Sequence, residues 1–384
     1  MGSLSKYMLV CFEVFNELYT AVGAGVLGMV VLIQHGFQSH QTIKNLSVVA
    51  LTAASLAFVF SRDKERLLAN KKKVVIITGC DSGLGYSLAQ HTADCGFTVI
   101  ATFLSLESKG SKEIKRLYGG YIIQIQLDIT DSKSVQSALQ TMEHYFTKNP
   151  DFTLHALVNN AGVMVFGEFE WQTEKLIQDQ IDVNLLGTMK VTNAFCPLIR
   201  QHKGRIITVS SHCAQANLPG LAVYGATKAG LSSWSDGLRV ELSKYGVDVV
   251  TFIPGSFTMD SNIMGHQIEH VQEMHDHFTK EQHQFYSDYF KRYNIYLSYI
   301  TPPKDIKKIS NEQLYKVFEG ALLDDPPSTV YKYEPWRYKM YHYLFRFSPV
   351  FIRDYFVVKF MKMPEYRENN GSEDDFEDLG GESI

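Results

Sequence analysis

Tyr224 and Lys228 form the pattern in this sequence whose chemistry is most definite, Tyr224-Gly-Ala-Thr-Lys228. If a helix opens here and runs to Tyr245, the two side chains are four positions apart and share one face. A free phenol has a pKa of about 10 and is a poor base at neutral pH, whereas a nearby ammonium favours the phenolate and lowers that pKa. The pair predicts a proton-transfer group for an alcohol; the alternative is a surface pair, in a chain with 21 tyrosines.

Ser211 and Asn184 are expected to lie close to that pair. Ser211 precedes Tyr224 by 13 positions (224 − 211) and follows a predicted strand, residues 205–209. Ligands of open α/β sheets bind at the carboxyl ends of strands, so this hydroxyl can hold a substrate oxygen beside the phenol. Ser210 is the adjacent competitor, expected in a turn or cap. Asn184 falls within a predicted helix, residues 173–199, where a buried amide must bond something: a water or a backbone group near Lys228.

A glycine-rich turn follows the first predicted strand. Residues 74–78 are apolar and β-branched, as in a strand buried on both faces. Gly79, Gly83 and Gly85 come next, and residues 86–95 are predicted to be helical. Glycines let the backbone approach a pyrophosphate, and a helix N-terminus offers free N–H groups and the positive end of a dipole. The turn predicts a dinucleotide site; a plain turn is the alternative.

Strand and helix patterns alternate from residue 72 to about 333, which predicts an α/β fold with a Rossmann-type doubly wound parallel sheet. Asn159-Asn160-Ala161-Gly162 ends a strand at the same edge as Ser211. The sequence shows no internal repeat. The other predicted elements are strands at 98–102, 122–128, 156–159, 248–253 and 329–331, and a helix at 132–146.

The composition describes a globular chain with an additional apolar part: 45% hydrophobic and 20% charged residues in 384. A net charge of −4 does not favour nucleic acid as a partner. The five cysteines are scattered without a Cys-x-x-Cys pair, which favours a reducing compartment and neither a disulfide framework nor a zinc site.

The N-terminal residues 1–70 are expected to be a membrane anchor of two hydrophobic helices, at residues 18–34 and 45–60. One span, or a hairpin packed on the domain, are alternatives. Six basic residues follow the second run, so the catalytic part is expected in the cytosol, on the endoplasmic reticulum. The mitochondrial inner membrane is the alternative, although no Arg precedes Arg62. A homodimer is one candidate assembly.

The predicted catalytic domain is residues 71–333; one segment within it and two segments after it are distinct. Residues 256–303 interrupt the alternation and are expected to be a substrate lid. Their five histidines lack a fixed ligand spacing, so a solvated helix is predicted and no metal site. Residues 334–366 are aromatic and basic, and are expected to be a helical extension that either packs on the core or lies at a membrane interface. Residues 367–384 are acidic and expected to be disordered.

The order and spacing of these motifs, with Pro254-Gly255, resemble those of the short-chain dehydrogenase/reductase family over residues 72–260. Residues 78–85 and 238–249 are similar to the branch with 17β-hydroxysteroid dehydrogenase type 2, 11β-hydroxysteroid dehydrogenase type 2, retinol dehydrogenases and 3-hydroxybutyrate dehydrogenase. The resemblance implies that Tyr224 is the acid/base and that Lys228 holds the ribose and lowers the tyrosine pKa. It implies that Ser211 orients the substrate and that Asn184 completes a proton relay.

The resemblance also implies a nicotinamide cofactor. The family usually has Thr five residues after the Pro of Pro-Gly, where Met259 stands here; Thr258 precedes it. NAD is favoured over NADP, because neither Cys80 nor residues 102–105 are basic and a 2′-phosphate needs Arg or Lys; Lys109 is the alternative partner for such a phosphate. The implied cofactor contacts are Gly79, Ser82, Gly83, Leu84, Gly85, Asp128, Asn160, Tyr224, Lys228, Pro254 and Gly255.

The function expected is a membrane-bound, NAD-dependent alcohol dehydrogenase for a small hydrophobic substrate, of the steroid 17β-hydroxyl or retinoid type. One alternative is 3-hydroxybutyrate oxidation, for which Lys280, Lys291 or Arg292 in the lid would have to bind the carboxylate. Another is a catalytically idle binding protein on the same fold.

Overall fold

The computed structural model describes residues 49–50, 53, 65–255, 261–300 and 306–367. The chain divides into two units, residues 1–65 and 66–384. The predicted anchor runs, residues 18–34 and 45–60, lie outside the described residues except for positions 49, 50 and 53, as do Thr258, Met259 and the predicted acidic tail beyond residue 367. Within the described part of the chain, no helix is both long and apolar enough to cross a bilayer.

The second unit is built on a parallel sheet of seven strands in the order β4-β3-β2-β5-β6-β7-β9. The order places β2 beside both β3 and β5, so the chain winds first to one side and then to the other, as predicted. Residues 74–77 are at most 1% exposed, which explains their continuous apolar sequence. The strands are β2 (Lys73–Ile77), β3 (Thr98–Phe103), β4 (Ile122–Gln126), β5 (Thr153–Asn159), β6 (Arg205–Val209), β7 (Asp248–Ile253) and β9 (Val330–Lys332).

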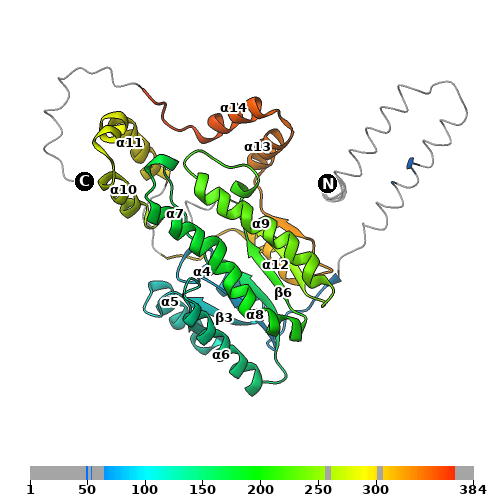
Figure 1. Ribbon diagram of the computed structural model, residues 1–384. Helices are drawn as coiled ribbons and strands as arrows, with labels where there is room; N and C mark the ends of the chain where they lie inside the picture. The colour runs from blue at the N-terminus through cyan, green and yellow to red at the C-terminus, as the bar shows by residue number, and fades with distance from the viewer. Residues whose placement is uncertain (1–48, 51–52, 54–64, 256–260, 301–305, 368–384) are drawn as a thin grey trace, which may run out of the picture. The chain divides into compact units, whose positions relative to one another are not determined.

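Helices cover both faces of this sheet, because successive strand residues point in opposite directions (Figure 1). Val75 belongs to the core packed under α4 (Gly83–Asp94), α5 (Lys109–Tyr118) and α12 (Glu312–Leu323). Val74 belongs to the opposite core, under α6 (Ser132–Lys148), α8 (Thr188–His202) and α9 (Ala222–Ser243). The short elements are β1 (Glu65–Arg66), β8 (Asp324–Asp325), η1 (Gly119–Tyr121), η2 (Phe169–Trp171) and η4 (His212–Ala214).

The segment predicted as one helix over residues 173–199 is helical without a break, but it is not α-helical throughout. The structure has α7 (Glu174–Ile181), a π-helix η3 (Asp182–Gly187) and then α8. Hydrophobic spacing does not distinguish a π-helical turn from an α-helix, and such turns are frequent at functional sites. Some predicted strands differ at their ends: the strand predicted at 122–128 ends at Gln126, and the strand predicted at 156–159 begins at Thr153.

The segment predicted as a lid forms α10 (Gln267–Asp276) and α11 (Lys280–Ile300), drawn in yellow in Figure 1. The buried side chain of Gln267 fastens α10 to the segment that follows β5, because its amide accepts from the Phe166 N–H and donates to the Phe166 carbonyl. Trp171 is the centre of its apolar contacts, with four rings of α11 at centroid distances of 4.9 to 5.7 Å. Among the lid's histidines, His266, His275 and His277 are exposed.

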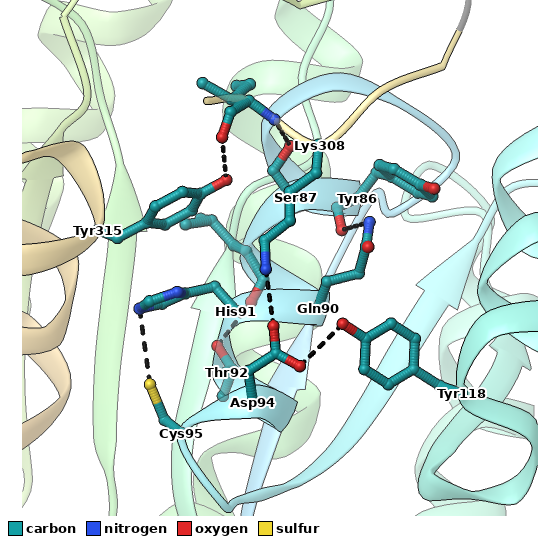
Figure 2. Close-up of polar contacts among 12 residues, drawn as sticks. Tyr86, Ser87, Gln90, His91, Thr92, Asp94, Cys95, Tyr118, Lys308 and Tyr315 are labelled. Atoms are coloured by element: carbon teal, nitrogen blue, oxygen red, sulfur yellow. Dashed lines mark hydrogen bonds and ion pairs between the residues drawn. The ribbon is translucent and has the colours of Figure 1, made fainter. Parts of the chain in front are cut away.

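Polar contacts fasten α4 to the segment that leads into α12 (Figure 2). Lys308 Nζ is 2.7 Å from Asp94 Oδ2, and the Tyr118 hydroxyl donates to Asp94 Oδ1 at 2.9 Å. The Ser87 hydroxyl accepts from the Ile309 N–H, whose carbonyl accepts from the Tyr315 hydroxyl. These contacts fix the position of α4, the helix that follows the glycine turn.

The aromatic and basic segment consists of α13 (Trp336–Phe347) and α14 (Val350–Met361). The structure shows the packing interpretation for part of it, and the membrane-interface interpretation stays a prediction. Phe345 and Val357 are buried, whereas Trp336, Phe351 and Tyr355 are 59% to 77% exposed. One side of the helix pair therefore packs on the protein and the other presents large aromatic side chains outward.

Candidate active site at the carboxyl edge of the sheet

The glycine turn between β2 and α4 forms a cradle that tolerates no side chain. Gly79 and Gly83 have φ values of +70° and +59°, a region that favours glycine. A Cβ on Gly85 would lie 2.2 Å from the Gly79 carbonyl oxygen and 2.3 Å from Asn160 Nδ2. The N-cap residue of α4, Ser82, makes no side-chain cap, so the first N–H groups of the helix face the cradle. The turn therefore fits a pyrophosphate.

Asn160 holds this turn in place. Its Nδ2 donates to the carbonyls of Thr78 and Gly79 at 2.9 and 3.1 Å. The Thr78 hydroxyl accepts in return from the N–H groups of Asn160 and Ala161, each at 3.0 Å. The amide is thus engaged with the backbone, so Asn160 acts on a cofactor by positioning the glycines, and a direct contact stays a prediction.

Tyr224 and Lys228 lie in the first turns of α9, 6% and 4% exposed. The Lys228 ammonium is 5.8 Å from the centre of the Tyr224 ring and donates to the Val209 carbonyl at 3.1 Å. They are therefore a buried pair at the carboxyl end of β6, and the alternative of a surface pair is wrong. Burial lowers the pKa of Lys228 to about 8.

The pKa of Tyr224 differs from the expectation. Burial is the largest effect and raises it above the usual value of a phenol; Cys213 adds to the rise and a hydrogen bond with Ser211 opposes it. No lowering by Lys228 is found among these effects; its ammonium lies 5.8 Å from the centre of the ring and donates to the Val209 carbonyl. The protein alone therefore keeps the phenol protonated, the form that donates a proton to a carbonyl or alkoxide oxygen.

Of the two adjacent serines, Ser211 is the one placed to act on a substrate. The Ser210 hydroxyl is 2.8 Å from the Ser232 hydroxyl and is 3% exposed, so it fastens β6 to α9. Ser211 caps η4, accepting from the Cys213 N–H at 3.2 Å, and its hydroxyl acts to lower the pKa of the neighbouring Tyr224 phenol.

Asn184 sits in η3 and is fully buried. Its Oδ1 accepts from the Val163 N–H at 2.8 Å, and its Nδ2 donates to the Val163 carbonyl at 2.9 Å and to Thr227 Oγ1 at 3.1 Å. A Cβ on Gly162 would be 3.1 Å from Asn184 Oδ1 and 3.5 Å from Lys228 Nζ. The structure thus brings Asn184 near Lys228, as expected, and gives it backbone partners.

One cavity of about 970 Å³ joins the cradle to this cluster. Its lining includes the predicted residues of the cradle and Asp128, Pro254 and Gly255; the Asp128 carboxylate also accepts from Thr130. Beyond Tyr224 the wall is largely apolar, with Met164, Phe166, Leu218, Leu221, Ile263, Met264, Tyr296, Tyr338, Phe360 and Met361.

The sequence did not identify most of this wall. Tyr338 of α13 and Phe360 of α14 follow Tyr224 by more than a hundred positions, and no local pattern relates them to it. The only signal was the density of aromatic residues in the segment. His212, next to Ser211, was missed as well. Burial, with a smaller effect from His342, lowers its pKa to about 4, against the opposing carboxylate of Glu334, so its imidazole is neutral.

Comparison with known proteins shows the family of this chain. The model of the short chain dehydrogenase family matches residues 73–269. Estradiol 17-beta-dehydrogenase 2 of Rattus norvegicus is 32% identical over 325 residues, which cover 82% of each chain. Retinol dehydrogenase 7 of Mus musculus is 30% identical over 312 residues, 80% of this chain and 95% of the relative. D-beta-hydroxybutyrate dehydrogenase of Mus musculus, a mitochondrial protein, is 38% identical over 205 residues, which cover 52% of this chain and 60% of the relative.

The chain belongs to the short-chain dehydrogenase family. It is an oxidoreductase that acts on CH–OH groups and uses a nicotinamide dinucleotide. The branch predicted from residues 78–85 and 238–249 is confirmed by these three relatives.

Proposed function

We propose that this enzyme is a membrane-bound, NAD-dependent dehydrogenase that interconverts a hydrophobic alcohol, of the steroid 17β-hydroxyl or retinoid type, and its carbonyl. The apolar wall of the cavity beside Tyr224 and Ser211 carries the proposal. Apolar and aromatic walls bury a large hydrophobic ligand and leave the few polar groups to orient its oxygen. Two of the relatives are named for estradiol and for retinol.

In the proposed reaction Tyr224 exchanges the proton with the substrate oxygen, while Ser211 bonds the same oxygen and fixes its position. The cofactor, when bound, accepts or donates the hydride. Lys228, with its ammonium 5.8 Å from the phenol ring, adds a positive charge that favours the phenolate during oxidation. Asn184 keeps the Val163 backbone and Thr227 in place beside this group, and so supports the proton path.

The hydroxybutyrate alternative has weaker support. It needs a cation for the carboxylate, and none of the three lid candidates is among the described residues that line the cavity. Arg292 bonds Asp288 at 2.7 Å and the Glu365 carbonyl at 2.9 Å. Lys362 is the cation that does line the cavity besides Lys228, and a small acid would have to use it.

Asp81 supports NAD over NADP. Its carboxylate accepts from the N–H groups of Leu104 and Ser105, at 2.9 and 3.3 Å, just after β3, where the ribose of a dinucleotide is expected. A carboxylate there repels a 2′-phosphate. We expect Asp81→Asn to raise the ratio of kcat/KM for NADP to kcat/KM for NAD. Glu107→Gln, on the same surface, is the control and should leave this ratio unchanged. An unchanged ratio in Asp81→Asn would show that Asp81 does not determine the choice of cofactor.

Two features support membrane association. The apolar runs at residues 18–34 and 45–60 have the length of spans, and six basic residues after them favour a cytosolic domain. The outward face of α13 and α14 adds exposed aromatic residues and Lys339 and Lys359.

Alkaline carbonate should leave the full chain in the membrane pellet. Asn370-Gly-Ser372 should stay unglycosylated in microsomes; a glycosidase-sensitive mass that Asn370→Gln removes would place the domain in the lumen.

A substrate panel tests the proposal. The full chain in detergent should form NADH with NAD and a 17β-hydroxysteroid or retinol, with a kcat/KM well above that for 3-hydroxybutyrate. The reverse order would overturn the proposed substrate class, and would favour the small-acid alternative.

A further inference from the structure

Three side chains with metal-ligand chemistry converge beside the active site, although the sequence predicted no metal site. His212 lies in η4, Glu334 between β9 and α13, and His342 in α13. Glu334 Oε1 is 3.3 Å from His212 Nδ1 and 3.0 Å from His342 Nδ1, and the three donor atoms all lie within 4.8 Å of one another. The two imidazole rings are stacked, with centroids 4.2 Å apart and planes 30° apart, so one ring has to turn for both nitrogens to point at one ion.

These distances are close to the separation of ligands around zinc. Zn–N and Zn–O bonds of about 2.0–2.2 Å in a tetrahedron place neighbouring ligand atoms about 3.2–3.6 Å apart. Two imidazoles and one carboxylate with a fourth, open position is a known zinc ligand set. The three side chains are 10% to 17% exposed, so a cation could enter and keep a water ligand.

A second observation points to a ligand. His212 is buried, yet neither of its ring nitrogens makes a hydrogen bond of acceptable geometry within the described part of the chain. The groups that its ring faces are the His342 ring, the Glu334 carboxylate and the backbone of Tyr333. Unpartnered polar atoms in a buried ring cost free energy, and a metal ion would supply the missing partner. The nearest competing cation, Lys332, donates to Gln215 Oε1 at 3.0 Å.

We propose that His212, Glu334 and His342 bind Zn²⁺, and that the ion fastens α13 to the segment that carries Ser211. His212 directly follows Ser211, and the Tyr338 ring of α13, which lines the cavity, is 6.1 Å from the rings of both His212 and His342. Occupancy of the site would therefore hold the C-terminal wall of the substrate cavity in place.

A second group, His91, Cys95 and Glu319 between α4 and α12, is the main competitor for a cation; His91 and Cys95 are drawn in Figure 2. Its carboxylate is already shared with Arg66, 3.5 Å away, and burial raises the pKa of the Cys95 thiol. Both effects oppose a cation there. The two groups are distinguishable in experiment, because only this one holds a sulfur ligand.

The test uses the full chain in detergent, stripped with a chelator, dialysed, and titrated with Zn²⁺ or with Co²⁺ as a spectroscopic probe. We expect one tightly bound equivalent of Zn²⁺, a visible Co²⁺ spectrum of low coordination number and no sulfur-to-cobalt band. His342→Ala and Glu334→Gln should lose the bound ion. Glu319→Gln and His144→Ala, whose side chain is exposed on α6, should retain it.

A second readout reports the fastening of α13. Saturating Zn²⁺ should slow tryptic cleavage at Lys339 and Lys359 several-fold in the wild-type chain and leave the rate in Glu334→Gln unchanged. Wild-type protein that retains no Zn²⁺ at micromolar concentration would overturn the proposal, without reference to any variant that might misfold. Binding that survives His342→Ala, or that depends on Cys95, would overturn it equally.

Discussion

Replacing Asn184 with Ala tests the packing of the active site, because the side chain is buried and fully bonded. The substitution removes the Asn184 bonds to the Val163 N–H, the Val163 carbonyl and the Thr227 hydroxyl, at 2.8, 2.9 and 3.1 Å. The Val163 groups are partly buried beside the cavity, and the Thr227 hydroxyl keeps its bond to the Tyr224 carbonyl. The free energy of unfolding should therefore fall by about 1–3 kcal/mol, the cost of one buried polar group that loses its partner.

Asn193→Ala is the matched control, since Asn193 is exposed on α8. Alanine favours a helix over asparagine by only a few tenths of a kcal/mol, so the control should be neutral or slightly stabilising. Denaturant unfolding of both variants and the wild type, followed by circular dichroism, gives the comparison. A loss of less than about 1 kcal/mol in Asn184→Ala would refute the assignment of these bonds as stabilising contacts of the site.

Two other predictions concern buried cations. Burial lowers the pKa of Lys228 to about 8, so from about pH 8 to about pH 10 the unfolded chain binds more protons than the folded chain. The free energy of unfolding, and with it the thermal midpoint, should therefore rise with pH over this range. Lys228→Met should abolish the rise, and Lys133→Met, at an exposed position, should leave it unchanged. Equal pH slopes in all three proteins would contradict the buried position of the ammonium. Arg205, 3% exposed, donates to the carbonyls of Ala321 and Asp324 at 2.7 and 3.1 Å. Because Arg205→Met removes this donor from both carbonyls, it should cost about 2–6 kcal/mol in denaturant unfolding, and exposed Arg116→Met less than about 1.

The sheet could be predicted well because parallel strands are buried on both faces and their sequences are continuous β-branched runs. The strands 205–209 and 248–253 were predicted at their observed bounds. The convergence of Ser211 with Tyr224 also followed from the sequence, since strand ends and the first turn of the next helix meet at one edge.

The parts that could not be predicted depend on tertiary contacts. The π-helical turn around Asn184 has no hydrophobic signature distinct from an α-helix. The pKa of Tyr224 could not be deduced from the spacing to Lys228, because burial of the phenol is the largest effect on it. The contribution of Tyr338 and Phe360 to the substrate wall depends on how α13 and α14 dock, which no local pattern encodes.

The most direct test of the account is the rate of NADH formation by Tyr224→Phe in the full chain, with NAD and a hydrophobic secondary alcohol. The substitution removes only the phenolic hydroxyl, so kcat should fall about a hundred- to ten-thousand-fold while NADH binding, measured by its fluorescence, stays close to that of the wild type. Tyr245→Phe, at the exposed end of the same helix region, should keep normal turnover. Turnover by Tyr224→Phe equal to that of the wild type would contradict the assignment of Tyr224 as the proton-transfer group.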